Sequence, residues 1–200
     1  PDANNMITIQ YELVSSSQQK RILGESMTIP PTRWREAAHF ISDRIFKKIT
    51  GMDGAFSSRV AYVLQYKREG NTRYRLEIAD ADGRQPNSVL DSAEPILSPS
   101  WSPDGQKIAY VSFESGKPAI YIQTLSNQQR QLIASFKGLN GAPAWSPDGH
   151  KLALTLSQDG NPEIYLLALA NKKLTRLTHH YAIDTEARWF PDGRALIFTS

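Results

Sequence analysis

The beginning of the chain shows two different periods of apolar residues. Between Met6 and Val14, apolar and polar residues alternate strictly, with Ile7, Ile9, Tyr11 and Leu13 on the apolar side. This period of two is typical of a half-buried strand. A polar stretch over residues 15–19 is followed by a second extended segment over residues 21–29. A β-hairpin is therefore predicted.

After Pro30-Pro31, the apolar residues recur at helical spacing. The spacings of four, three, four and four predict one apolar stripe of a helix that faces a sheet, formed by Trp34, Ala38, Ile41, Ile45 and Ile49. Thr32 is the expected N-cap of this helix. The helix should end near Thr50, because Gly51 can adopt the left-handed conformation that closes helices.

Beyond residue 54 the pattern becomes entirely strand-like and repeats. Trp-Ser-Pro-Asp-Gly begins at Trp101 and again at Trp145, and Trp-Phe-Pro-Asp-Gly begins at Trp189, so the period is 44 residues. In the second unit, four extended stretches are expected at 96–101, 107–113, 119–125 and 130–134. Four short antiparallel strands at this period describe a blade of a β-propeller.

The first unit departs from this pattern, because no Trp-Ser-Pro-Asp-Gly precedes residues 60–63. Its innermost strand is expected to come from a more C-terminal part of the protein. Residues 1–50 are interpreted as the end of an N-terminal α/β domain, 51–55 as a linker, and 56–200 as blades 1–3 with the start of blade 4. We expect this segment to be truncated at both ends, because a propeller needs at least four blades.

Composition narrows the functional classes. The chain of 200 residues is 40% hydrophobic and 22% charged, as in ordinary globular proteins, and its net charge of +3 is scattered. No basic stripe for nucleic acid and no apolar run for a membrane span is present in the sequence. There is no cysteine. The chain starts on Pro1-Asp2, and we interpret it as a mature or excised segment from which the signal sequence is absent.

Most chemically suggestive residues have a structural interpretation. Each repeat Trp is predicted to pack between blades, and each Asp of the Pro-Asp-Gly turns should accept backbone hydrogen bonds. Asp80-Ala81-Asp82-Gly83 is predicted to be a hairpin tip. The histidines, His39, His150, His179 and His180, show no metal-site spacing, and no catalytic motif is found. No catalytic residue, metal or cofactor is therefore predicted.

The loops that lead into the innermost strands are the better candidates for a site. Chain topology places them at one mouth of the propeller together with the hairpins between second and third strands, and the Ser-Pro-Asp-Gly turns at the opposite face. Their side chains differ between repeats, as a binding surface on a repeated scaffold requires. The predicted partner-binding residues are Leu97, Ser98, Asn140, Gly141, Ala142, Asp184, Thr185 and Glu186.

The helix and its junction with the repeats, residues 34–45 and 50–63, resemble the TolB family of the Tol-Pal envelope system, as do residues 113–117 and 140–145. This resemblance implies a six-bladed propeller behind an N-terminal α/β domain. It implies a non-enzymatic periplasmic protein of a Gram-negative bacterium that binds the lipoprotein Pal. Ala142, Thr185 and Glu186 match positions that the family uses for Pal.

The same resemblance implies contacts with other Tol proteins, a role in outer-membrane integrity and cell division, and use of the same surface by colicin translocation peptides. The sequence thus favours a protein-binding scaffold. The alternative is the propeller gate of a prolyl-oligopeptidase-like serine peptidase, because Trp-Ser-Pro-Asp-Gly units occur there as well.

Overall fold

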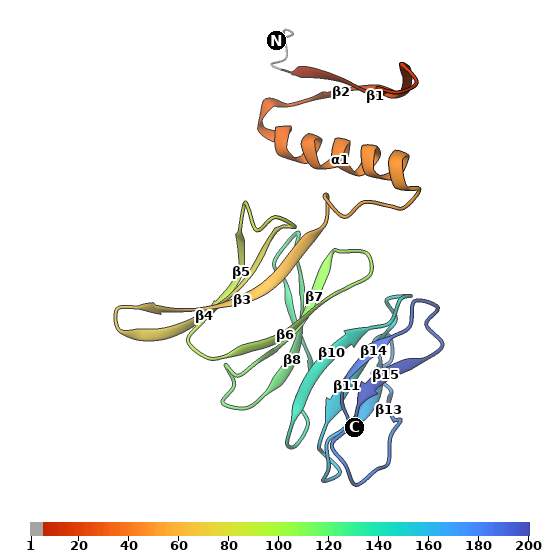
Figure 1. Cartoon of the computed structure of the whole chain (residues 1–200). Coiled ribbons are helices and arrows are strands. Elements are labelled where there is room, and N and C mark those ends of the chain that lie inside the picture. The colour runs from red at the N-terminus through yellow and green to blue at the C-terminus, as the bar shows by residue number, and fades with distance from the viewer. Residues whose placement is uncertain (1–5) are drawn as a thin grey trace. The chain divides into compact units, whose positions relative to one another are not determined.

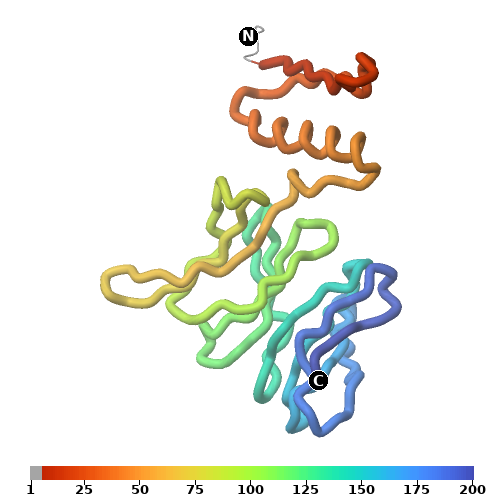
Figure 2. The backbone as a smooth tube through the Cα atoms, viewed as in Figure 1, coloured from red at the N-terminus to blue at the C-terminus, as the bar shows by residue number. Residues whose placement is uncertain are grey.

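The computed structural model describes residues 6–200, which divide into two compact units (Figures 1 and 2). The first unit contains residues up to Val60 and the segment Ala79–Pro86. The second contains Ala61–Ile78 and Asn87–Ser200. The chain therefore passes between the units three times. No helix among the described residues is long and apolar enough to cross a bilayer.

In the first unit, strands β1 (Ile7–Ser15) and β2 (Lys20–Ile29) form the predicted antiparallel hairpin, which pairs Ile7 with Ile29. Residues along β1 are half-buried and exposed in strict alternation, as expected from the period of two. Helix α1 (Trp34–Thr50) is held to the hairpin by Arg44, whose Nε lies 3.2 Å from a carboxylate oxygen of Glu25. Gly51 ends the helix at φ 77°, with its N–H bonded to Lys47 O at 2.9 Å.

The prediction for the start of the helix was wrong. Thr32 lies inside a 3₁₀ turn, η1 (Pro31–Arg33), and Arg33 occupies the N-cap position of α1 without a capping side-chain bond. Proline at the first helical position explains this result, because its fixed φ favours a helical turn before Thr32 could cap one.

The predicted apolar stripe of α1 is also only partly correct. Ile41 and Ile45 are half-buried, but Trp34 is 57% and Ile49 is 66% exposed. The fully buried helical residue is Ala37 and not its neighbour Ala38. A two-stranded sheet is narrow and covers the middle of a helix better than its ends, which accounts for the exposure of Trp34 and Ile49.

The second unit consists of consecutive antiparallel sheets (Figure 1). Three strands form the first blade: β3 (Arg59–Arg68), β4 (Asn71–Asp80) and β5 (Asn87–Ser92). Four form the second: β6 (Ile96–Trp101), β7 (Lys107–Ser112), β8 (Ala119–Thr124) and β9 (Arg130–Ala134). Four form the third: β10 (Asn140–Trp145), β11 (Lys151–Leu156), β12 (Glu163–Ala168) and β13 (Leu174–Arg176). Two strands, β14 (Thr185–Trp189) and β15 (Leu196–Thr199), begin the fourth. The antiparallel sheets follow one another in the order predicted for the blades, and the first sheet has three strands.

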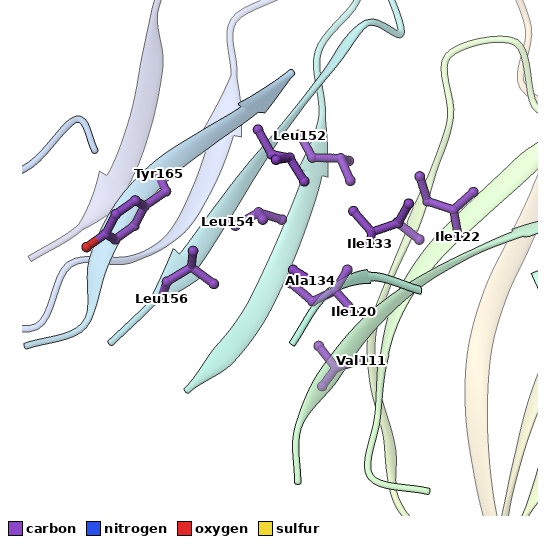
Figure 3. Packing of buried hydrophobic residues seen from close by; sticks show 11 residues of the cluster. Val111, Ile120, Ile122, Ile133, Ala134, Leu152, Leu154, Leu156 and Tyr165 are labelled. Carbon is purple, nitrogen blue, oxygen red and sulfur yellow. The ribbon is translucent and has the colours of Figure 1, made fainter. Parts of the chain in front are cut away.

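The core of the unit lies between facing blades. Side chains of the second blade, such as Ile120 and Ile133, meet Leu152, Leu154 and Leu156 of the third (Figure 3). The three leucines are completely buried. Strands buried on both faces explain why the sequence reads as short continuous apolar runs here and not as alternation.

Neighbouring blades are joined by the same repeat position each time. The indole Nε1 of Trp145 donates to Ser100 O at 3.2 Å, and that of Trp189 donates to Ala144 O at 3.1 Å. Each tryptophan thus packs between blades, as predicted, and also satisfies a main-chain carbonyl of the preceding innermost strand.

The turns after the tryptophans repeat in atomic detail. In the second blade, Ser102 N donates to Lys107 O at 2.9 Å, and Asp104 Oδ1 accepts the Gln106 N–H at 3.0 Å. Gly105 has φ 65°, where a side chain would be strained. The predicted role of the aspartate in the turn is confirmed.

Candidate partner-binding mouth

The strand register places the predicted loops at one end of the blades. Ile96, at the start of β6, pairs with Ser112 at the end of β7, and Ser112 pairs with Ala119 at the start of β8. The loops before β6, β10 and β14 and the hairpins after β7 and β11 therefore lie at the same end. We call this end, with residues 93–98, 135–142 and 177–186, the mouth. The end with the turns at 102–106, 146–150 and 190–194 is called the turn face.

A β-bulge interrupts each innermost strand next to the mouth. The register shifts between Leu97 and Ser100 in β6, and at the corresponding places in β10 and β14. Ser98, Ala142 and Glu186 lie at the same repeat position inside these bulges, with φ of 49°, 44° and 58°. A left-handed residue other than glycine costs roughly 1–2 kcal/mol. Three such residues in three consecutive blades indicate a constraint on the backbone at this position, and bulges of this kind redirect side chains beside binding sites.

The structure places seven of the eight predicted residues on three adjacent innermost strands, and Asp184 directly before the third of these strands. Strand β10 lies beside both β6 and β14. Across the last pair of blades, Thr185 Oγ1 is 3.2 Å from Thr155 Oγ1. The strands thus present Leu97 and Ser98, then Gly141 and Ala142, then Thr185 and Glu186, side by side.

The eight residues differ in how accessible they are. Leu97 and Glu186 are exposed, and Ser98, Gly141 and Thr185 are half-buried. Asn140, Ala142 and Asp184 are buried, so their side chains can only support the surface from below. The accessible part of the predicted site is therefore smaller than the sequence suggested.

Asn140 shows how such support works. Its Oδ1 accepts the Phe136 N–H at 2.9 Å, and its Nδ2 donates to Phe136 O at 2.8 Å. These bonds close the loop that leads into β10. Asp184 occupies the corresponding position in the fourth repeat and donates its N–H to Pro162 O at 3.0 Å. Within residues 6–200, its Oδ1 has no hydrogen-bond partner.

The loop before β14 is organised around a buried carboxylate that the sequence analysis missed. Glu163 is completely buried and accepts the His180 N–H at 2.8 Å, a bond from Arg176 Nη2 at 3.0 Å, and the Thr178 hydroxyl. Burial raises the pKa of Glu163, but these hydrogen bonds outweigh it, so the pKa lies below its ordinary value. The corresponding residue of the second blade is Ala119. This difference between repeats was the signal in the sequence that could have identified Glu163.

Apolar side chains surround the polar positions of the mouth. Tyr181 is 90% exposed and its ring lies 4.2 Å from that of His180. Ile183 and Leu139, which share one repeat position, are 60% and 40% exposed. Exposed aromatic and aliphatic groups near the Glu186 carboxylate suit contact with a protein surface. Tyr181 was not predicted, because a lone aromatic in a loop carries no pattern.

A second polar cluster lies in the first unit, where His39, Asp80 and Asp82 bring possible ligand atoms within 4.8 Å of one another. Arg35 already contacts both aspartates, at 3.4 Å for Asp80 and 2.6 Å for Asp82. The hydrogen bond from Arg35 is the main cause that lowers the pKa of Asp82. The cluster is thus an arginine–aspartate network that fixes the predicted hairpin tip onto α1.

Comparison with known proteins decides the family. The family model described as the TolB beta propeller domain matches residues 46–200. The chain belongs to the TolB family. It is 54% identical over 142 residues to the Tol-Pal system protein TolB of Acinetobacter baylyi, which covers 71% of this chain and 33% of that relative.

The solved structure of TolB from Acinetobacter baumannii matches with a TM-score of 0.91 and 51% identity, over 96% of this chain and 48% of that one. This TolB-family chain thus spans a third to a half of the length of these relatives. A puromycin hydrolase structure matches with a TM-score of 0.53 and 14% identity, over 62% of this chain and 22% of that one. That likeness shows the propeller fold alone.

Proposed function

We propose that this protein is a periplasmic, non-enzymatic binding component of the Tol-Pal system and that its propeller mouth receives the lipoprotein Pal. In this role it would contact other Tol proteins, maintain outer-membrane integrity and act in cell division. Colicin translocation peptides would use the same surface. The high identity to TolB relatives supports assignment to this system.

The repeated bulge is the observation that carries the proposal for the mouth. Its backbone is the same in three blades, but the residue at its centre changes from Ser98 to Ala142 to Glu186. A fixed backbone with a variable side chain is a suitable construction for recognition without chemistry. The exposed apolar groups around it, Leu97, Leu139, Tyr181 and Ile183, would supply the buried centre of the interface.

Glu186 is the best residue with which to test this proposal. Its side chain is 56% exposed, and its carboxylate lies 3.5 Å from Arg188. Glu186→Lys would place two positive charges together at the mouth and change the field that a partner meets. We expect the affinity of the whole protein for Pal, measured by calorimetry, to fall about tenfold.

Glu12→Lys is the matched control, because Glu12 is an exposed carboxylate of β1 that also pairs with an arginine, Arg21. It changes the net charge equally but lies in the first unit. Binding should be unchanged in this variant. Equal affinities of the wild type and Glu186→Lys, with the fold intact, would remove Glu186 from the site. A whole protein that does not bind Pal would refute the proposed function itself.

A further inference from the structure

The turn face carries a cleft that the proposed function does not use. It has a volume of about 800 Å³ and lies between the second and third blades. Buried Ile122 and Ile133 and partly buried Trp145 form its apolar floor, and Lys107, His150 and Lys172 stand on its rim. The volume is within the range of ordinary ligand sites.

The rim is positively charged. Among the described residues that line the cleft, none is acidic. The side chains of Lys107, His150 and Lys172 are exposed and form no ion pair within the described part of the chain. Arg130 also lines the cleft, but its guanidinium lies 2.6 Å from Glu114 and over the ring of Tyr121, so its charge is already matched.

The nearest aspartates in the sequence are committed to the turns. Asp104 Oδ1 accepts bonds from Ser102 Oγ at 2.5 Å and from Gln106 N at 3.0 Å. Asp148 Oδ1 accepts bonds from Ser146 Oγ at 2.6 Å and from His150 N at 2.9 Å. Lys107 attracts Asp104 electrostatically, but neither Lys107 nor Lys172 forms an ion pair within the described residues, so both can contact an anionic group that comes from outside.

The walls of the cleft are tied together by main-chain contacts. His150 O accepts the Leu169 N–H at 3.0 Å, which ties the turn after β10 to the turn after β12. At Gly149, an added Cβ would lie 3.4 Å from Pro103 Cγ, so the turns of neighbouring blades lie close together. A preformed cleft binds without the cost of ordering its walls.

The shape and chemistry of the walls favour a peptide over a small anion. One wall is β9, which is the outermost strand of its blade and leaves one backbone edge unpaired within the described chain. Such an edge can receive an extended segment. We propose that this cleft binds an acidic, extended peptide segment of a partner protein, with an apolar side chain on the floor and carboxylates at Lys107 and Lys172.

The test uses the whole protein and a labelled synthetic octapeptide of alternating glutamate and leucine, with fluorescence anisotropy as the measurement. Lys107→Gln combined with Lys172→Gln should weaken binding about tenfold, because two exposed ion pairs are lost. The control is Lys117→Gln with Lys137→Gln, which removes two exposed lysines from loops at the opposite end of the blades. This pair should leave the affinity unchanged.

Three results would overturn the proposal. The first is failure of the wild type to bind the peptide. The second is equal weakening in both double variants, which would indicate only net charge. The third is that the wild type binds vesicles with 30% anionic phospholipid but does not bind the peptide. If this vesicle binding depends on Lys107 and Lys172, the cleft contacts a lipid surface. The Lys107 and Lys172 variant leaves the mouth unchanged, so its affinity for Pal should equal that of the wild type. Measuring Pal binding and peptide binding separately therefore shows which of the two proposals fails.

Discussion

Replacing Glu163 with glutamine should loosen one loop of the mouth without touching its surface. The Thr178 hydroxyl already accepts the Ile164 N–H at 2.9 Å, so it donates its own hydrogen to Glu163. Three donors therefore converge on a buried carboxylate. In the glutamine variant, an amide nitrogen faces one of these donors, and the charge opposite Arg176 is lost.

The expected cost follows from these contacts. Losing one charge-assisted hydrogen bond in a buried site lowers the free energy of unfolding by about 2 kcal/mol. For a protein of this size, the melting temperature should fall by about 4–8 °C. Calorimetry measures this shift, and hydrogen exchange should show faster exchange at residues 180–184, next to the lost contact.

The effect should depend on pH in a defined direction. The pKa of Glu163 is below its ordinary value of 4.5. Its contribution to stability is therefore complete above that value and is lost as the pH falls through the lower, folded-state pKa. The stability difference between wild type and Glu163→Gln should be constant from about pH 6 to 7 and shrink in more acidic solution.

Glu12→Gln provides the control, because the Glu12 ion pair is exposed and worth little. Its unfolding curve should coincide with that of the wild type. If Glu163→Gln also unfolds like the wild type at pH 7, with unchanged exchange at residues 180–184, the buried carboxylate does not hold the loop.

Two further substitutions test how neighbouring blades are joined. Trp145→Phe keeps a ring in the core but leaves Ser100 O without its indole donor. The free energy of unfolding, measured in urea, should therefore fall by about 1 kcal/mol or more. A value equal to that of the wild type would show that water replaces this hydrogen bond. Gly149→Ala and Gly116→Ala should lower the melting temperature by similar amounts, because both glycines have positive φ and an added Cβ at Gly149 would only reach van der Waals contact with Pro103. A clearly larger loss for Gly149→Ala would show that the turns of neighbouring blades press against each other.

The sequence was sufficient for the parts of the fold that repeat. The spacing from Trp101 to Trp145 and Trp189 predicted the blades and their strands, since each copy confirmed the others. The helix start at Thr32 was wrong, because the local preference of Pro31 outweighed a capping side chain. The first unit occurs only once in the chain, so no second copy was present with which to compare the predicted helix start.

The candidate site was harder to predict, for two physical reasons. Positive φ at Ser98, Ala142 and Glu186 is imposed by the bulge and not by the residue, so no common side chain marks it. Burial of Asn140 and Asp184 depends on how each loop folds back, and the Glu163 network joins residues up to 17 positions apart. Sequence pattern located the loops, but it could not separate the residues that face outward from those beneath them.

The contact of each repeat tryptophan with the preceding blade has a consequence for how such a protein can evolve. Because Trp145 and Trp189 make the same bond one repeat apart, a blade carries both the donor for its predecessor and the acceptor for its successor. A 44-residue unit can therefore be duplicated, deleted or exchanged as a module that keeps its junctions. The residue in the bulge moves with that module, so recognition can diversify one blade at a time while assembly stays unchanged.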